Sequence, residues 1–286
     1  MPELPEVEIT RLGLKSLINY KVSEVVIRNS SLRWPVDRSL HKILIGRKLI
    51  SLKRRGKYIL AEFPNGTLII HLGMSGHLCI VSKDREIMKH DHVDIVFDNV
   101  NHKIVRYNDP RRFGCILWTE KNPLKHKLLD NLGPEPLSSD FDVDYLFQKL
   151  RKKTASIKNT IMNSHVVVGV GNIYASEALF HAKIRPQREA HKVTMTEANN
   201  LVLAIKETIK NAILKGGSSI NNFFDVNGKN GYFQNEHQVY GRKDKPCILC
   251  KNPIQQIILG QRSSFYCKKC QQYIKKLVDY IFCLEC

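Results

Sequence analysis

Short apolar or alternating stretches follow one another from residue 20 to about residue 120, and turn-forming sequences such as PNG, GMSG and DNVN separate them. The stretches are KVSEVVI, KLISLKRRGKYILAEF, GTLIIHLG, HLCIVS, HVDIVFDN and CILWTE. Alternation with a period of two is typical of strands that bury one face, and short polar breaks favour hairpins. The pattern therefore predicts an antiparallel sheet system here, folded as a β-sandwich.

A helix is predicted ahead of these strands, in the opening stretch MPELPEVEIT. Pro5 suits the first helical position, and Glu6 would face the positive end of the helix dipole. Apolar residues then recur on one side at helical spacing. The helix accounts for Pro5 and Glu6, but Pro2 and Glu3 precede it and remain without a structural role.

The second half of the chain has a different pattern. NLGPEPLSSDF is rich in Pro, Gly and Ser and predicts a linker. Helical periodicity follows over 142–152, 154–163, 172–182 and 196–214, and then a long polar loop over 217–234. We therefore expect an α+β fold with a sandwich domain over 1–131, a helical domain over 132–236, a zinc hairpin over 237–272 and an additional tail over 273–286.

The charge of the chain favours a polyanionic partner. Its 286 residues include 45 Lys and Arg against 27 Asp and Glu, a formal net charge of +18. Such an excess suits phosphate contacts and counterion release, although a generally basic surface would give the same total. The opening residues lack the apolar core of a signal peptide, and no apolar run approaches membrane-spanning length. We expect a cytoplasmic protein without a membrane partner.

Six of the eight cysteines lie in the last 40 residues as three CxxC pairs. Two matched pairs at this spacing can close a tetrahedral thiolate site, which predicts one structural Zn²⁺. A redox dithiol is the weaker interpretation, because no βαβ pattern surrounds the pairs. The third pair, Cys283 and Cys286, cannot complete such a site alone, and no role is assigned to it. The four predicted zinc ligands are Cys247, Cys250, Cys267 and Cys270.

Two short stretches combine cations with turn-forming residues. In KRRGKYIL, Gly56 favours a hairpin turn or bulge that lifts Lys57 off the sheet, although solvated edge charges are the usual alternative. In NDPRRFG, Arg111 and Phe113 have the same strand parity, so both could project from one turn. That pair suits insertion into a base stack, and a turn with Phe113 in the core is the alternative.

A third stretch, VVVGVGNIYASEALF, joins two helices through a Gly-x-Gly-Asn turn. Backbone N–H groups at the start of the second helix offer an anion site, and a tight packing turn is the ordinary alternative. Lys152 and Lys158 lie just upstream and favour a phosphate at this position.

Taken together, these stretches resemble one family, the formamidopyrimidine-DNA glycosylases of bacterial base excision repair. The resemblance is carried by eight motifs in family order: PELPEVE, RRGKYIL, HLGMSG, KHDHVD, DPRRFG, VVGVGNIYASE, GYFQNE with QVYGRK, and the CxxC pairs around QRSSFYCKKC. It covers the chain up to about Gln272, and the third cysteine pair is a departure from the family pattern. It implies a helix–two-turns–helix motif, a zinc ribbon and a monomer that binds damaged double-stranded DNA.

The resemblance also implies the chemistry. Pro2, exposed as a secondary amine once Met1 is removed, is similar to the family nucleophile that attacks C1′ of the damaged nucleoside. Glu3 would protonate the opened sugar, and Lys57 would donate a proton during β-elimination. Arg262 matches the residue for δ-elimination and phosphate binding. The implied activity is a bifunctional glycosylase and AP lyase that removes 8-oxoguanine and formamidopyrimidines.

The remaining implied roles are contacts with DNA. Met74, Arg111 and Phe113 match the residues that fill the void left by the everted base, and loop 217–234 resembles the lid over that base. The other implied DNA contacts are His90, Lys152, Lys158 and Asn172.

Two alternatives stay open at the level of sequence. An endonuclease VIII-like glycosylase for oxidised pyrimidines shares the terminal proline, the helical motif and the zinc ribbon. A non-catalytic zinc-ribbon protein that binds DNA would explain the charge and the cysteines, but it would leave Pro2, Glu3 and Lys57 unused.

Overall fold

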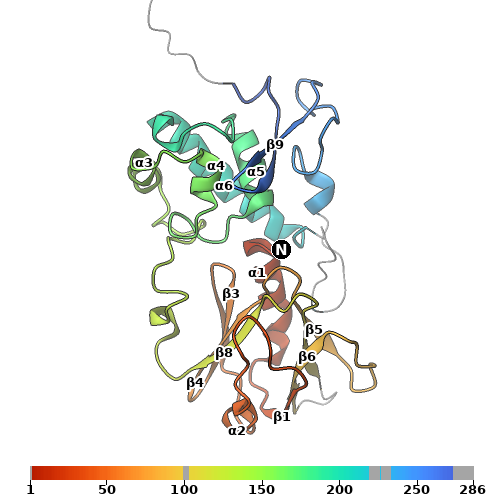
Figure 1. Ribbon diagram of the computed structural model, residues 1–286. Helices are drawn as coiled ribbons and strands as arrows, with labels where there is room; N and C mark the ends of the chain where they lie inside the picture. The colour runs from red at the N-terminus through yellow and green to blue at the C-terminus, as the bar shows by residue number, and fades with distance from the viewer. Residues whose placement is uncertain (1, 99–102, 219–225, 227–232, 273–286) are drawn as a thin grey trace, which may run out of the picture.

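The computed structural model describes residues 2–98, 103–218, 226 and 233–272. A β-rich half and a helical half lie one above the other in Figure 1, and the first helix begins where they meet. The predicted α+β class, with antiparallel sheets, is confirmed. The predicted tail 273–286 and most of loop 217–234 lie outside the described residues.

Helix α1 (Leu4–Gly13) opens the fold and continues into the 3₁₀ turn η1 (Leu14–Leu17). The helix begins one residue earlier than predicted, so Pro5 occupies its second position. Pro5 is tolerated there because the first N–H groups of a helix have no intrahelical partner. The buried side chains of Val7, Leu14 and Leu17 join the core of the sandwich.

The β-rich half consists of two four-stranded antiparallel sheets, ordered β1-β6-β7-β5 and β2-β3-β4-β8. Their apolar side chains form one core, which also receives the short helix α2 (Leu40–Leu44). The sequence pattern missed α2 and β7, whose buried Arg106 interrupts an otherwise apolar strand. The strands are β1 (Val22–Ile27), β2 (Ser51–Arg55), β3 (Tyr58–Phe63), β4 (Gly66–His71), β5 (His77–Val81), β6 (Asp91–Phe97), β7 (Ile104–Asn108) and β8 (Cys115–Thr119).

The helical half is built around α5 (Asn172–His181), of which eight of ten residues are buried. Helices α3 (Val143–Arg151), α4 (Ile157–Ile161) and α6 (Met195–Leu214) surround it, in good agreement with the predicted ranges. Short 3₁₀ turns are η2 (Pro123–Lys125), η3 (Ala190–Lys192) and η4 (Phe233–Glu236). None of the helices in the described ranges is both long and apolar enough to cross a membrane.

A separate two-stranded hairpin, β9 (Gln255–Leu259) and β10 (Arg262–Tyr266), lies between the two cysteine pairs. It packs on the helical half through Phe265, which belongs to the same apolar cluster as Phe180 of α5. The end of the hairpin is therefore held beside the start of α5, which β10 also contacts.

Candidate functional site

The buried Glu3 carboxylate occupies the N-terminus of α5. Its Oε2 accepts a hydrogen bond from the Gly171 N–H at 2.8 Å, and its Oε1 accepts one from the Ile173 N–H at 3.0 Å. A Cβ on Gly171 would lie 2.3 Å from the Glu3 carboxyl carbon, so only glycine fits there. The anion site that the Gly-x-Gly-Asn turn predicts is thus filled by a side chain of the protein itself.

Glu6 supports the same segment from within α1. Its Oε2 accepts the Glu3 N–H at 2.7 Å, and its Oε1 accepts the Ser218 N–H at 2.9 Å and a bond from the Tyr174 hydroxyl. Burial, and then the charge of Glu3, raise the pKa of Glu6. These bonds fix the backbone next to Pro2, which is half-buried at the junction of the two halves.

Lys57 approaches this junction from the β2–β3 turn. Arg55 pairs with Tyr58, so Gly56 and Lys57 form a two-residue turn, and Gly56 adopts a φ of +57°. The predicted hairpin turn at Gly56 is therefore present. Burial lowers the pKa of Lys57, the charges of Glu3 and Glu6 raise it, and the charge of Arg262 lowers it further. The lysine amine thus lies in the electrostatic field of both N-terminal carboxylates.

Arg262 reaches the same region from the zinc hairpin. It is exposed and follows the two-residue turn between β9 and β10. It also lines a cavity of about 610 Å³, most of whose other residues belong to turns of the sandwich. Besides Arg262, the lining residues are Ser31, Leu32, Arg33, His71, Gly73, Met74, Arg111, Arg112 and Phe113.

Met74, Arg111 and Phe113 meet in this cavity although they come from two turns. The Met74 and Phe113 side chains are 37% and 45% exposed, so Phe113 is not a core residue. The Arg111 guanidinium carbon lies 4.6 Å from the centroid of the Phe113 ring, a cation–π arrangement. An apolar and cationic surface of this kind suits insertion between bases.

The four cysteines predicted as zinc ligands converge. Their sulfur atoms all lie within 4.8 Å of one another. The Cys250–Cys267 and Cys247–Cys270 sulfur distances are 3.4 and 3.8 Å. Tetrahedral Zn–S bonds of about 2.3 Å place neighbouring sulfur atoms about 3.8 Å apart, so the four thiolates fit a zinc ion.

Comparison with known proteins agrees with this geometry. Family models match in order: the formamidopyrimidine-DNA glycosylase N-terminal domain over 1–116, its H2TH domain over 132–224, and the zinc finger found in FPG and IleRS over 244–272. The formamidopyrimidine-DNA glycosylase of Methylobacillus flagellatus is 49% identical over 272 residues, which cover 95% of this chain and 97% of the relative. This chain belongs to the formamidopyrimidine-DNA glycosylase family.

Solved structures of family members superpose over nearly the whole chain. Wild-type Lactococcus lactis Fpg in complex with DNA containing N7-benzyl-Fapy-dG has a TM-score of 0.88 and 34% identity, covering 95% of this chain and 100% of that one. Lactococcus lactis Fpg in complex with abasic-site DNA has a TM-score of 0.86 and 35% identity, with the same coverage. These comparisons confirm the resemblance to formamidopyrimidine-DNA glycosylases that the sequence motifs indicated.

Lys158 lies where the motifs of the family place it, but it does not face solvent. Its side chain is 1% exposed, and its Nζ donates to Asn172 Oδ1 at 2.7 Å, Ser264 Oγ at 2.8 Å and the Ser263 carbonyl at 3.1 Å. Burial lowers the pKa of Lys158 to about 7. In this structure Lys158 therefore connects α5 to the zinc hairpin, and its expected contact with phosphate stays a prediction.

Two other expected DNA contacts of the family lie apart from the 610 Å³ cavity. Lys152 is exposed directly after α3. His90 is half-buried before β6 and lines a separate cavity of about 300 Å³, together with Arg85 and Lys89. The charges of Glu3 and Arg262 thus both act on the pKa of Lys57, whereas neither Lys152 nor His90 lines the 610 Å³ cavity.

Sequence reasoning missed Asp109, which organises the two turns of the cavity. Its buried carboxylate accepts bonds from the Ser75 hydroxyl at 2.7 Å and the Gly114 N–H at 2.9 Å. The Ser75 hydroxyl in turn accepts the Arg111 N–H at 3.2 Å. In the sequence Asp109 reads as an ordinary turn residue, and its motif DPRRFG was the only available signal.

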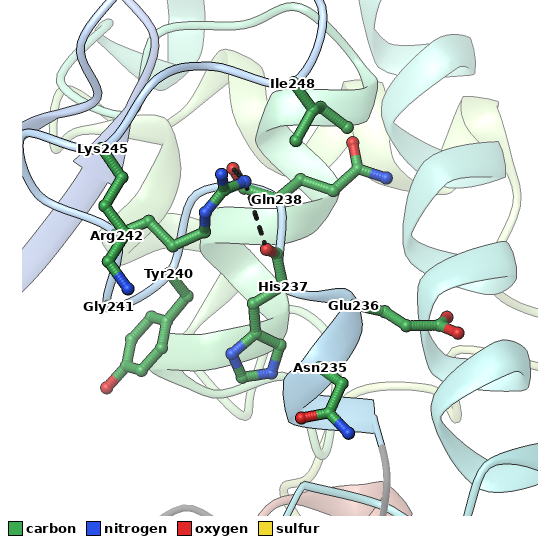
Figure 2. A pocket seen from close by; sticks show the side chains of 9 residues that line it. All are labelled: Asn235, Glu236, His237, Gln238, Tyr240, Gly241, Arg242, Lys245 and Ile248. Carbon is green, nitrogen blue, oxygen red and sulfur yellow. Dashed lines mark hydrogen bonds between the residues drawn. The ribbon is translucent and has the colours of Figure 1, made fainter.

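Glu177 was also missed. Its buried carboxylate accepts backbone N–H bonds from Gln238 at 2.8 Å, Val239 at 3.1 Å and Tyr240 at 2.8 Å. These residues belong to the segment 235–242, which lines a cavity of about 670 Å³ beside the zinc hairpin and is shown in Figure 2. One α5 side chain thus fixes the segment that leads to the first cysteine pair.

Proposed function

We propose that this chain is a bifunctional DNA glycosylase and AP lyase that excises oxidised purines, namely 8-oxoguanine and formamidopyrimidines, from duplex DNA. The observation that carries the proposal is the position of the Pro2–Glu3 segment at the N-terminus of α5, where the Glu3 carboxylate accepts two backbone N–H bonds. The charges of Glu3 and Arg262 also both act on the pKa of Lys57. Family membership and the DNA complexes of the relatives support it.

Pro2 supplies the nucleophile after Met1 is removed. An α-amino group ordinarily has a pKa of about 8, so an appreciable fraction of the amine molecules is neutral at physiological pH. Its nitrogen forms a bond to C1′ while the bond from C1′ to the base breaks, and the electron pair leaves with the base. The nitrogen then loses its proton, and opening of the sugar ring gives an iminium intermediate. Glu3, adjacent in sequence, delivers a proton to the opened ring oxygen.

Lys57 and Arg262 serve the later steps. Burial lowers the pKa of Lys57, which makes its proton easier to donate during β-elimination. Arg262 keeps a permanent charge and is exposed at the end of the hairpin, which suits a phosphate that leaves during δ-elimination. The zinc ion, held by the two CxxC pairs, would supply no chemistry beyond holding this hairpin folded.

The exposed residues of the 610 Å³ cavity fill the space that an everted base leaves. Extrusion of a base costs a few kcal/mol, and Met74 and Phe113 offset part of this cost by stacking. Arg111, held over Phe113, faces the orphaned partner base. Damaged double-stranded DNA is the partner of a cytoplasmic monomer in this proposal.

Borohydride trapping tests the proposed chemistry. An 8-oxoguanine:cytosine duplex should give a covalent adduct with the wild type, and Pro2→Gly should lose far more of its strand cleavage than of its DNA affinity. Preferential trapping on a thymine-glycol duplex would instead favour the pyrimidine-specific alternative. Absence of any adduct with the wild type would favour a non-catalytic DNA-binding protein.

A further inference from the structure

The linker between the two halves holds the turn that carries Lys57. Glu135 Oε1 accepts the Gly56 N–H at 2.7 Å and Arg55 Nη1 at 3.1 Å. Its Oε2 accepts Arg54 Nη1 at 2.6 Å. One linker carboxylate therefore contacts the three residues that immediately precede Lys57.

The two arginines complete this clamp and are not free to bind phosphate. Arg55 Nη2 donates to the linker carbonyls of Leu132 at 2.8 Å and Gly133 at 2.6 Å. Arg54 Nε donates to Glu8 Oε2 on α1 at 2.9 Å. The basic cluster of KRRGKYIL thus joins β2 to the linker and to α1.

The opposite side of the turn is closed by the helical half. A Cβ on Gly56 would lie 3.2 Å from the Val168 Cβ, and the φ of +57° at Gly56 also favours glycine. Val168 belongs to the loop that leads into α5, on which Glu3 is seated. The turn is therefore enclosed by segments of both halves.

We propose that Glu135 is a positioning residue that sets the place of Lys57 relative to Glu3. The proposal rests on the proposed function, in which the Lys57 amine takes part in the reaction. A misplacement of about 1 Å can cost a reaction about 100-fold, so a turn held by one carboxylate is a sensitive point. Glu135 lies in the linker, far from Lys57 in the sequence, so the sequence motifs gave no indication of this role.

Steady-state cleavage of an 8-oxoguanine:cytosine duplex, which gives kcat and KM, tests this role. Glu135→Ala should lower kcat about tenfold and leave KM within about twofold, because DNA binding depends on other residues. Glu135→Gln keeps an acceptor for the Gly56 N–H and should recover most of the rate. Glu62→Gln is the matched control, because Glu62 pairs with Lys53 on the same hairpin at 2.8 Å but does not touch the turn.

A double-mutant cycle with Lys57→Ala distinguishes positioning from general damage. If Glu135 acts through Lys57, Glu135→Ala should cause no further loss of kcat in the Lys57→Ala background. An equal loss in both backgrounds, or wild-type kcat in Glu135→Ala, would overturn the proposal. If Glu135→Ala does not fold, Glu135→Asp takes its place in the cycle, because the shorter carboxylate keeps the charge but does not reach the Gly56 N–H. An inactive wild type would instead refute the proposed function.

Discussion

The two halves of the molecule place their polar groups differently. In the sandwich, an apolar core fills the space between the sheets, and Met74, Arg111 and Phe113 project from turns at its edge. In the helical half, α5 is enclosed on nearly all sides, and its own Glu177 and Lys158 of α4 are buried with their charged groups hydrogen-bonded. The first arrangement leaves side chains exposed at a cavity, and the second holds segments of the protein together.

This difference sets what each substitution should affect. An exposed turn residue has few partners within the protein, so its loss should change the rate of DNA cleavage and leave the free energy of unfolding nearly unchanged. A buried polar group leaves unpaired partners behind, so its loss should lower the free energy of unfolding.

The largest effect on stability should follow removal of zinc. Structural zinc contributes about 10–16 kcal/mol of binding free energy in zinc-finger peptides, so Cys267→Ser should unfold the hairpin. Hydrogen exchange followed by mass spectrometry should show lost protection over residues 244–272, while the strands of the sandwich stay protected. Uniform loss of protection would contradict the separation of the two halves.

Lys158→Met should lower the free energy of unfolding by about 2–4 kcal/mol, because one buried and two partly buried acceptors lose their donor. Denaturant unfolding measures the change. Lys152→Met is the control, since Lys152 is exposed and its loss should cost less than about 0.5 kcal/mol. Similar costs for both variants would mean that burial does not decide the effect.

The pH dependence of stability should report the same lysine. Its pKa is lowered to about 7 in the folded protein, whereas the unfolded chain keeps the proton until about pH 10. Between these values the unfolded state binds more protons, so stability rises with pH, by at most about 1.4 kcal/mol per pH unit. The wild type should gain stability relative to Lys158→Met from pH 7 to pH 10, and a constant difference would refute the lowered pKa.

Phe113→Ala should have the smallest effect on stability, within about 0.5 kcal/mol, because its ring is nearly half exposed. Its effect should appear instead in the rate of cleavage of an 8-oxoguanine duplex. A large loss of stability would show that the turn contributes to the core of the sandwich.

Local patterns predicted those features that depend on neighbouring residues. The CxxC pairs, the Gly56 turn and the ranges of α3, α5 and α6 could be read directly from spacing and periodicity. The alternation of NDPRRFG left Phe113 open between core and surface, since a turn residue can point either way.

Buried polar groups could not be predicted, because their partners lie far away in the sequence. Lys158 meets Ser264 across 106 residues, so a single lysine near a glycine turn gave no sign of burial. The charged Arg106 obscured β7 in the sequence pattern, and in the fold its charge is neutralised by Asp94 of the neighbouring strand at 3.0 Å. Glu177 bonds to backbone N–H groups, which leave no mark in the sequence.

The contact between Glu3 and the N–H group of Gly171 spans 168 positions of the chain. During synthesis Glu3 leaves the ribosome long before the helix that receives it, which follows only after the sandwich is complete. Domains of this size generally fold in the order of their synthesis. In the proposed mechanism, the Pro2 amine is not held in position until α5 has been translated. Reactivity toward DNA therefore begins only when the helical half is complete.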